Sequence, residues 1–357
     1  MEDVIKVFII DDSAVVRTTI ASLVEDDKRI FLMGSASDPI LAQEKFIKKG
    51  WPDVIILDIE MPRMDGLTYL KKIMSEHPTP VIICSSVAQG GSKNAIEALS
   101  LGAVEVIAKP GIGVKSFLEE TKGHFLYVIK AAAKAKLTQT KKVGIPFNIE
   151  DRTKNSADVI LPLKLKTAQR MQKIIAIGAS TGGVQILERI LRELSVDVPP
   201  IVITQHMPAG FTKSLADRLD KICTVSVKEA QDGDKLLHGR VLLAPGDKHM
   251  MLRREGRSYS VEIKDGPKVS RHKPSVDVLF RSCANEAGAD AMGIILTGMG
   301  DDGARGLKEM FDSGAKTYSQ EEASCIVYGM PKVALEIGAS MGTLSLEEII
   351  EMIQKVK

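Results

Sequence analysis

Hydrophobic residues in the first third of the chain form short continuous runs that are separated by helical repeats. The continuous runs lie at residues 7–10, 54–57, 81–84 and 104–108. Between them, apolar residues recur every three or four positions, as in the repeat of Val16, Ile20, Leu23 and Val24. Short apolar runs that alternate with amphipathic helices are typical of a parallel sheet with helices on both faces. We therefore predict a first α/β domain with a doubly wound parallel sheet over residues 1–128.

The same alternation returns over residues 171–357. An apolar run at 174–177, a helical repeat and a second run at 201–204 form the pattern of a βαβ unit. Between about residues 225 and 264, short segments are broken by turn pairs that are typical of antiparallel hairpins. These pairs are Asp232-Gly233, Pro245-Gly246 and Glu255-Gly256. We predict a second doubly wound parallel sheet with an antiparallel insert.

Residues 129–170 show neither pattern beyond the end of the last helix of the first domain. The segment has little hydrophobic periodicity, and Gly144 and Pro146 interrupt it. Its basic residues include Lys141, Lys142, Lys154, Lys164, Lys166 and Arg170. A basic segment of this kind is typical of a solvated linker, so we predict a linker between the two domains.

Composition excludes several functional classes. The chain has 357 residues, of which 44% are hydrophobic and 26% are charged, enough for two domains with sizeable cores. A formal net charge of +2 gives no reason to expect nucleic acid binding. Four cysteines without CxxC spacing predict a reducing, cytoplasmic location rather than disulfides or a metal cage. The acidic start Met1-Glu2-Asp3 and the lack of an 18-residue apolar run predict neither export nor membrane insertion.

Acidic side chains follow two strands of the first predicted sheet. Asp11 and Asp12 come directly after the first apolar run, and Asp58 comes after the second. The carboxyl ends of parallel strands meet at one edge, where carboxylates repel one another unless a hard cation such as Mg²⁺ bridges them. Ser85 and Lys109 follow the next two runs and join the same edge. Together these groups indicate a site at which a carboxylate accepts a phosphoryl group.

A serine, a histidine and an acidic pair occupy strand ends of the second predicted sheet. Ser180 lies in a glycine-rich turn, His206 follows the next strand, and Asp301 and Asp302 follow a later one. A hydroxyl, an imidazole that takes its proton and a carboxylate that orients the imidazole are the groups that acyl transfer needs. The spacing does not choose between Asp301 and Asp302. The chain order Ser, His, Asp also departs from the Ser, Asp, His order of α/β-hydrolases.

The other histidines are weaker candidates for the base. His77, His124 and His238 are expected to be ordinary surface residues. His249 and His272 lie in polar motifs and remain open as residues that line a cleft or bind substrate. We prefer His206 because its strand is predicted to lie next to that of Ser180.

Six spaced motifs of the second region resemble the CheB family of chemotaxis methylesterases. They are GASTGG at 178–183, QHMPAGFT at 205–212, APGDKHM at 244–250, KPSVDVLF at 273–280, TGMGDDG at 297–303 and EASCIVYGMP at 322–331. About the first 125 residues resemble the receiver domain of two-component response regulators. The resemblance spans nearly the whole chain except the linker. It implies a flavodoxin-like receiver domain at 1–128 and a Rossmann-like methylesterase domain at 171–357.

The resemblance also implies roles for individual residues. In the second domain it implies Ser180 as nucleophile, His206 as base and Asp302 as orienting acid, with Thr181, Met299 and Gly300 as candidates for the oxyanion site. In the first domain it implies Asp58 as the phosphorylated residue, Ser85 and Lys109 as switch residues, and Asp11, Asp12, Asp58 and the backbone carbonyl of Glu60 as Mg²⁺ ligands. The esterase reaction is expected to need no cofactor.

The function implied by the resemblance is hydrolysis of γ-glutamyl methyl esters on methyl-accepting chemoreceptors, with release of methanol, and deamidation of some receptor glutamines. The implied phosphodonor is a chemotaxis histidine kinase. A phosphoryl group on Asp58 adds negative charge that is expected to draw Ser85 inward and change the distal surface of the domain. We hypothesise that this change relieves autoinhibition, so that a chain beginning near Met171 is active without phosphorylation.

Three other functions are open to comparison. A dinucleotide-binding turn is disfavoured because Ser180 stands where a GxGxxG turn needs glycine. A DNA-binding regulator is disfavoured because the second region is long, rich in strands and without a concentrated basic face. A catalytically inactive scaffold that binds receptors is not excluded by the sequence, although Ser180, His206 and Asp302 are all present.

Overall fold

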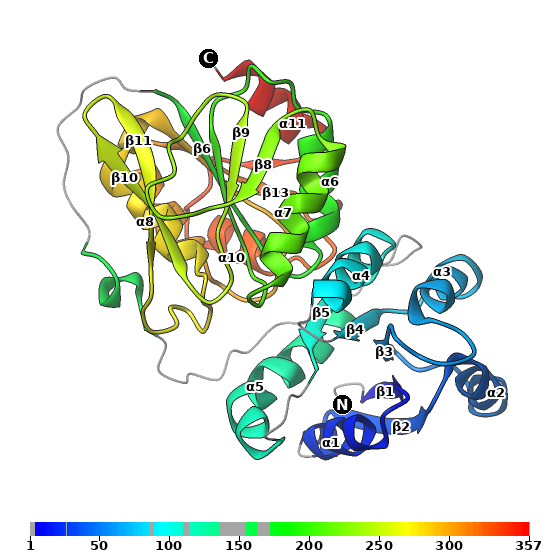
Figure 1. Ribbon diagram of the computed structural model, residues 1–357. Coiled ribbons are helices and arrows are strands. Elements are labelled where there is room, and N and C mark those ends of the chain that lie inside the picture. Colours follow the sequence, from blue (N-terminus) through cyan, green and yellow to red (C-terminus); the bar gives the residue numbers. More distant parts are fainter. Residues whose placement is uncertain are drawn as a thin grey trace. The chain divides into compact units, whose positions relative to one another are not determined.

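The computed structural model describes residues 4–25, 27–85, 89–109, 114–135, 155–162 and 172–356. The chain divides into two compact units, Met1–Leu137 and Thr138–Lys357 (Figure 1). Each unit contains a parallel sheet with connecting helices, so the predicted α/β class is confirmed. Most of the predicted linker, and the side chain of His124, lie outside the described residues.

The first unit is built on a five-stranded parallel sheet with the order β2-β1-β3-β4-β5. Its strands are β1 (Ile5–Ile10), β2 (Ile30–Ala36), β3 (Val54–Asp58), β4 (Val81–Ser85) and β5 (Glu105–Ala108). Helices α1 (Ala14–Glu25) and α5 (Val114–Ala133) contact each other on one face, and the other face is covered by α2 (Pro39–Lys49), α3 (Gly66–Glu76) and α4 (Gln89–Ser100). Every residue of β3 and β4 is buried, which explains their continuous apolar pattern.

The second unit contains a seven-stranded parallel sheet with the order β14-β13-β12-β6-β7-β9-β8. Its strands are β6 (Ile174–Ala179), β7 (Ile201–Gln205), β8 (Ser226–Glu229), β9 (Arg240–Leu243), β12 (Ala291–Ile295), β13 (Lys316–Gln320) and β14 (Thr343–Leu344). The chain builds outward from β6 toward β8 and then returns to build from β12 toward β14. The strand order therefore reverses beside β6, at the centre of the sheet.

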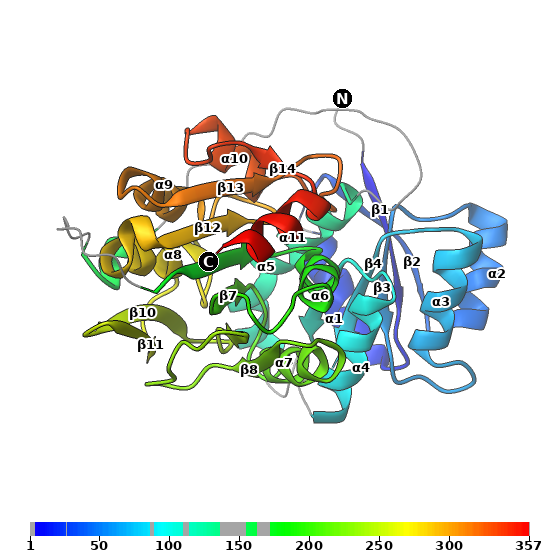
Figure 2. The ribbon, with the colours of Figure 1, turned by 90° about the horizontal axis from the view of Figure 1, so that it is seen from above.

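Helices cover both faces of this sheet (Figure 2). One face carries α6 (Gly183–Arg192), α7 (Phe211–Ile222) and α11 (Leu346–Lys355), and the other carries α8 (Val276–Glu286), α9 (Ala304–Asp312) and α10 (Met330–Glu336). A short 3₁₀ turn, η2 (Gly288–Asp290), joins α8 to β12. Among the helices of the described residues, none combines the length and the apolar character needed to cross a membrane.

The antiparallel insert is smaller than the turn pairs predict. Only β10 (His249–Glu255) and β11 (Ser258–Lys264) form an antiparallel hairpin in the described part of this unit, which closes at Gly256 and packs beside α8 (Figure 1). The segments around Asp232-Gly233 and Pro245-Gly246 instead flank β8 and β9, which join the main sheet as parallel strands. The turn residues identified where the chain bends but not which strand each segment pairs with, because pairing depends on distant residues.

Part of the predicted linker packs on the second unit. The segment 155–162 contains the 3₁₀ turn η1 (Ala157–Val159) and places Ala157 and Ile160 in an apolar cluster with Met251, Val269 and Val278. Arg281 of α8 donates to Asp158 at 2.5 Å and is also paired with Glu309 of α9. The sequence predicts linker here because the residues that bury this segment lie about a hundred positions later in the chain.

Candidate active site and receiver site

Three strand ends of the second sheet meet where the strand order reverses. Strand β6 pairs with β7 on one side and with β12 on the other. Ala179 lies opposite Gln205, so Ser180 and His206 are the next residues of two neighbouring strands. The N–H of His206 donates to the carbonyl of Ala179 at 3.1 Å, and Gln205 Nε2 donates to the carbonyl of Ser180 at 2.9 Å. Such a reversal is where open α/β sheets form their ligand crevice.

The turn around Ser180 requires close backbone approach. A Cβ atom at Gly298 would lie 2.7 Å from Ser180 Cβ. Two carbon atoms that are not bonded to each other do not approach this closely, so only glycine fits at position 298. Gly182 has a φ of +78°, and a Cβ atom there would meet Ile326 at 2.6 Å. The N–H of Ser180 donates to the carbonyl of Thr297 at 3.0 Å. The loop after β12 is therefore packed directly against the serine.

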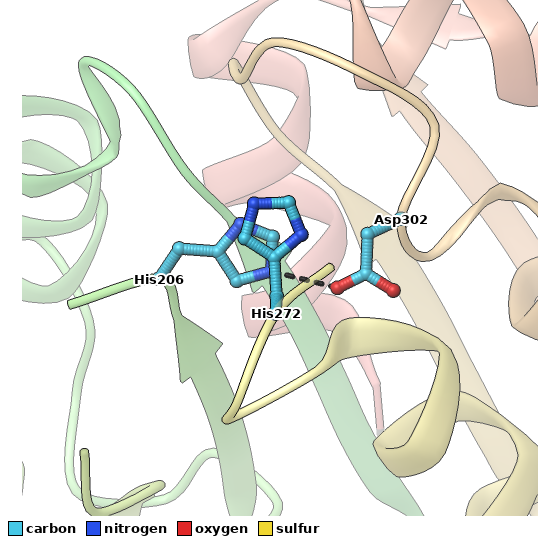
Figure 3. Close-up of side chains that lie close together, drawn as sticks. All are labelled: His206, His272 and Asp302. Carbon is cyan, nitrogen blue, oxygen red and sulfur yellow. Dashed lines mark hydrogen bonds and ion pairs between the residues drawn. The ribbon is translucent and has the colours of Figure 1, made fainter. Parts of the chain in front are cut away.

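His206 is paired with Asp302 rather than with its neighbour Asp301. His206 Nε2 lies 2.7 Å from Asp302 Oδ2 (Figure 3). An ionised carboxylate only accepts hydrogen bonds, so the proton of the neutral imidazole lies on Nε2. Nδ1 of His206 is buried and has no hydrogen-bond partner among the described residues. Nδ1 is consequently the ring nitrogen whose lone pair can accept a proton.

The carboxylate of Asp302 is held by three further donors. It accepts hydrogen bonds from Ser275 Oγ at 2.8 Å and from the N–H groups of Val276 and Asp277 at 2.8 and 3.1 Å. These donors lie at the start of α8, where the helix dipole favours negative charge. Burial alone would raise the pKa of Asp302, but its hydrogen bond to His206 and the nearby imidazoles lower it to about 2. Asp302 is therefore charged throughout the neutral pH range.

His272 stacks on the ring of His206. The two rings are 5° from parallel with centroids 3.8 Å apart, and His272 Nδ1 lies 2.8 Å from the carbonyl of Ser270 (Figure 3). Ligand atoms of His206, His272 and Asp302 lie within 4.8 Å of one another, which is close enough for a metal ion. Stacked rings, however, direct their nitrogen lone pairs within parallel planes rather than toward a common point. The arrangement fits mutual orientation of the rings better than metal binding.

Backbone N–H groups beside Ser180 are not used by the protein. Within the part of the chain that the structure describes, the N–H groups of Thr181, Met299 and Gly300 donate to no protein acceptor. Thr181 and Met299 are buried, and Gly300 has a φ of +92°. Buried N–H groups are nearly always paired in folded proteins. Thr181 follows Ser180 directly, and Met299 and Gly300 follow Gly298, which packs against the serine. Donors without a protein acceptor in these two turns can bind an oxyanion of a substrate.

The remaining histidines have other surroundings. His249 is fully buried, with Nε2 at 3.0 Å from the carbonyl of Pro267, and its Nδ1 accepts from the N–H of Ser275 at 3.3 Å. Both ring nitrogens are thus used by backbone, and burial lowers its pKa. His238 is exposed, and His77 stacks on Trp51 in the first unit. Of the two histidines that the sequence leaves open, only His272 contacts the candidate base.

The first unit gathers its acidic residues at the carboxyl edge of the sheet. One carboxylate oxygen from each of Asp11, Asp12 and Asp58 lies within 4.8 Å of the others. Lys109 Nζ lies 2.7 Å from Asp58 Oδ2 and 3.2 Å from Asp11 Oδ2. Burial and the charge of Asp11 raise the pKa of Asp58 to about 6 despite this lysine. One ammonium leaves the cluster negative, and its all-oxygen donors fit a hard divalent cation.

The other predicted receiver residues occupy the surrounding loops. Ser85 is buried, and its hydroxyl donates to the carbonyl of Gly91 in α4 at 3.2 Å. Its own carbonyl accepts from the N–H of Lys109 at 2.8 Å. Glu60 is exposed after β3, and its N–H donates to Asp58 Oδ1 at 3.3 Å. The structure thus brings Lys109 to the carboxylates, whereas the hydroxyl of Ser85 is engaged by α4.

Sequence reasoning missed the groups that hold the acidic residue of the His–Asp pair. Ser275 and Asp277 belong to the motif at 273–280, which indicates a polar start of a helix but not what that start contacts. The structure places this helix start against Asp302. The signal that could have found them was a serine just ahead of the first turn of a predicted helix, where N–H groups need an acceptor.

Comparison with known proteins supports both units. The family model described as CheB methylesterase matches residues 175–353, and the response regulator receiver domain model matches residues 7–116. A solved structure, the catalytic domain of Thermotoga maritima CheB methylesterase, covers 53% of this chain and 100% of its own length, with 36% identity and a TM-score of 0.51.

Two curated relatives are similar over nearly the full length. A protein of Geobacter metallireducens, named protein-glutamate methylesterase/protein-glutamine glutaminase 3, is 52% identical over 97% of both chains. A protein of Chromobacterium violaceum, named protein-glutamate methylesterase/protein-glutamine glutaminase 2, is 52% identical over 98% of this chain and 99% of its own. The chain belongs to the CheB methylesterase family and carries a response regulator receiver domain ahead of its catalytic domain.

Proposed function

We propose that this chain is a protein-glutamate methylesterase and protein-glutamine glutaminase that acts on chemoreceptors and is controlled by phosphorylation of its receiver domain. The observation that carries the proposal is the 2.7 Å pair of His206 and Asp302 at the strand ends beside Ser180. The names of relatives that are 52% identical over nearly the whole chain support the substrate class.

In the proposed reaction, Ser180 Oγ attacks the γ-carbonyl carbon of a glutamyl methyl ester while His206 Nδ1 takes the hydroxyl proton. The unused N–H groups of Thr181, Met299 and Gly300 stabilise the oxyanion of the tetrahedral intermediate, at about 3 to 4 kcal/mol for one such donor. The C–O bond to the methoxy group then breaks. His206 returns the proton to the leaving oxygen, which departs as methanol.

Water completes the cycle. His206 Nδ1 takes a proton from water while the water oxygen attacks the acyl carbon of the ester with Ser180. The bond from that carbon to Ser180 Oγ then breaks, His206 returns the proton to Oγ, and the glutamate side chain is released. A glutamine substrate follows the same path and releases ammonia in place of methanol. Throughout, Asp302 keeps its charge and holds His206 Nε2–H, which fixes the tautomer that leaves Nδ1 free.

In the receiver domain we propose that Asp58 is phosphorylated by the histidine kinase of the same signalling system. Asp11, Asp12, Asp58 and the carbonyl of Glu60 would hold Mg²⁺, which supplies positive charge to the phosphoryl oxygens. Lys109 already contacts Asp58 and would keep that contact with the phosphorylated residue. Ser85 would exchange its bond to the carbonyl of Gly91 for a phosphoryl oxygen, and this exchange moves the start of α4.

The test is methanol release from methylated chemoreceptor membranes by the full chain. The wild-type chain and Ser180→Ala are compared with and without a small phosphodonor and Mg²⁺. We expect release that depends on Ser180 and rises with phosphodonor. A methylated receptor that loses no methanol in the presence of the wild-type chain contradicts the esterase assignment and favours a receptor-binding scaffold.

A further inference from the structure

The start of α8 contains a buried carboxyl group that the reaction itself does not use. Asp277 is the second residue of α8, is 2% exposed and takes part in three side-chain hydrogen bonds. Its Oδ1 accepts from the N–H groups of Gly303 and Gly306 at 2.9 and 2.8 Å, and its Oδ2 lies 3.0 Å from Ser270 Oγ. These three partners belong to two separate segments beside the active site.

One arm of this network fixes the loop that carries Asp302. Helix α9 begins directly after Gly303, which has no side chain to cap the free N–H groups of the first turn. Asp277 supplies that acceptor from α8. The approach is close enough that a Cβ atom at Gly306 would lie 2.8 Å from the carbonyl of Asp277. Because Asp302 immediately precedes Gly303, the cap sets the position of its backbone.

The other arm reaches the ring stack. Ser270 and Arg271 have φ values of +47° and +74°, which L residues rarely adopt, so this turn needs contacts that hold it. Ser270 bonds Asp277 through its hydroxyl and His272 Nδ1 through its carbonyl at 2.8 Å. His272 in turn lies parallel to His206 (Figure 3). The turn at Ser270 thus connects Asp277 to the face of the base.

We propose that Asp277 is a positioning residue for the hydrolysis, which sets Asp302 through the cap of α9 and the ring of His206 through Ser270 and His272. The inference rests on the proposed function. Asp277 touches neither the substrate nor the reacting atoms. It acts by fixing the loop of Gly303 and the turn of Ser270 relative to each other. Its removal therefore changes the rate of the chemical step more than the binding of receptor.

Of the two neighbouring carboxyl groups, Asp277 and Asp302, it is Asp302 that carries the negative charge. Burial and the neighbouring charge of Asp302 raise the pKa of Asp277 to about 8, whereas Asp302 is ionised. Asp277 Oδ1 accepts from two N–H groups, and its Oδ2 accepts from Ser270 Oγ. Asparagine has nearly the same shape and no charge. Its amide oxygen can keep both N–H groups, and its amide nitrogen can donate to Ser270 Oγ. Asp277→Asn therefore preserves the network that Asp277→Ala removes.

The experiment measures kcat and KM for methanol release by the full chain with phosphodonor. For Asp277→Ala we expect kcat to fall by about 10- to 100-fold with KM changed less than about twofold, which is typical of a misplaced catalytic group. Asp277→Asn is expected to keep kcat within about threefold of wild type. The matched control is Asp290→Ala, which removes another buried carboxylate of this unit, paired with Lys173 at 2.9 Å, and is expected to keep the wild-type kcat.

Two results overturn the proposal: an Asp277→Ala chain with the kcat of wild type, or equal loss of kcat in the alanine and asparagine variants. If the alanine variant does not fold, Ser270→Ala decides, because it removes only the arm toward His272. We expect its kcat to fall by about 3- to 10-fold with a normal KM, and an unchanged kcat contradicts the proposal.

Failure of the proposed function gives a different pattern. A wild-type chain that releases no methanol disproves the esterase assignment without regard to Asp277. In that case the imidazole N–H resonance of His206 remains a test of position. We expect the hydrogen-bonded Nε2–H signal in wild type and in Asp277→Asn, and its loss or broadening in Asp277→Ala. An identical signal in all three chains overturns the positioning role.

Discussion

The two units treat a buried carboxylate in opposite ways. Asp302 is fully buried, yet its pKa falls to about 2, because His206, Ser275 and two N–H groups of α8 all point hydrogen atoms at it. Asp58 is 2% exposed, and its pKa rises to about 6. Burial and the charge of Asp11 raise this pKa by more than Lys109 lowers it, because the single ammonium of Lys109 is paired with both carboxylates. Burial is similar at the two sites. The number and charge of the partners decide which carboxylate is satisfied.

This difference matches what each site has to do. In the proposed reaction Asp302 would orient an imidazole and keep its charge at every step, which fits a carboxylate whose hydrogen-bond partners are all already in place. In the proposed function the receiver cluster would attract a cation and a phosphoryl group, which fits the excess of carboxylates over the one ammonium of Lys109. An unsatisfied carboxylate is thus a binding signal, and a satisfied one is a structural part of the catalytic machinery.

The largest expected effect comes from removing the satisfied charge. Asp302→Asn keeps the shape of the side chain but removes the acceptor charge that fixes the proton on His206 Nε2. We expect kcat to fall by about 10³- to 10⁴-fold, equivalent to about 4 to 5.5 kcal/mol of transition-state stabilisation. The measurement is methanol release from methylated receptors. Asp301→Asn is the control, and a loss of similar size in that variant contradicts the assignment of the pair.

A smaller effect is expected from removing the unsatisfied charge. Asp58→Asn cannot accept a phosphoryl group, so its rate of methanol release with phosphodonor should equal its rate without. In the wild-type chain we expect stimulation of about tenfold, equivalent to about 1.4 kcal/mol of coupling between the sites. Stimulation that persists in Asp58→Asn, after correction for the background reaction of the donor, contradicts phosphorylation at this residue.

Separating the two units tests whether the second unit, which contains Asp302, is active without the first. A chain beginning at Asn155 keeps the segment 155–162, and we expect it to release methanol without Mg²⁺ or phosphodonor. A chain beginning at Gln172 loses the apolar contacts of Ala157 and Ile160 and the bond of Arg281 to Asp158. We expect it to be less stable by about 2 to 4 kcal/mol, or a midpoint lower by about 5 °C or more. Equal unfolding midpoints of the two shortened chains contradict the packing role of this segment. Activity of the chain beginning at Asn155 that is no higher than that of the unphosphorylated full chain contradicts autoinhibition.

The smallest expected effect is the pH dependence of the receiver. The raised pKa of Asp58 means that its charge costs stability above about pH 6 and that this cost is relieved as the pH falls through that value. Between pH 7 and pH 5, without Mg²⁺, we expect wild type to gain about 1 kcal/mol of stability relative to Asp58→Asn. The single tryptophan, Trp51, lies in the first unit and reports its unfolding in urea by fluorescence. A relative change of the opposite sign contradicts the raised pKa.

Local pattern predicts most of the fold. The order of strands and helices follows from hydrophobic periodicity, which each segment displays by itself, and the ends of the apolar runs are sufficient to place Ser180, His206 and Asp58 at sheet edges. The predictions that differ from the observed fold involve distant pairing. Strands β8 and β9 join the main sheet, and the segment 155–162 packs on the hairpin and α8, because their partners lie far away in the sequence.

The sequence by itself determined the two α/β domains, the family resemblance and the residue types at each strand end, because these depend on spacing along the chain. Spacing left Asp301 and Asp302 open, and the tertiary structure shows the contact of His206 with Asp302 that the resemblance implied. Only the tertiary structure decided that His272 stacks on His206 and that Asp277 holds both loops. Those contacts form because the start of α8 packs against two loops, one before it in the chain at Ser270 and one after it at Asp302 and Gly303. Distances of a few ångströms between such segments, and the charge states that follow from them, are set only when the helices pack.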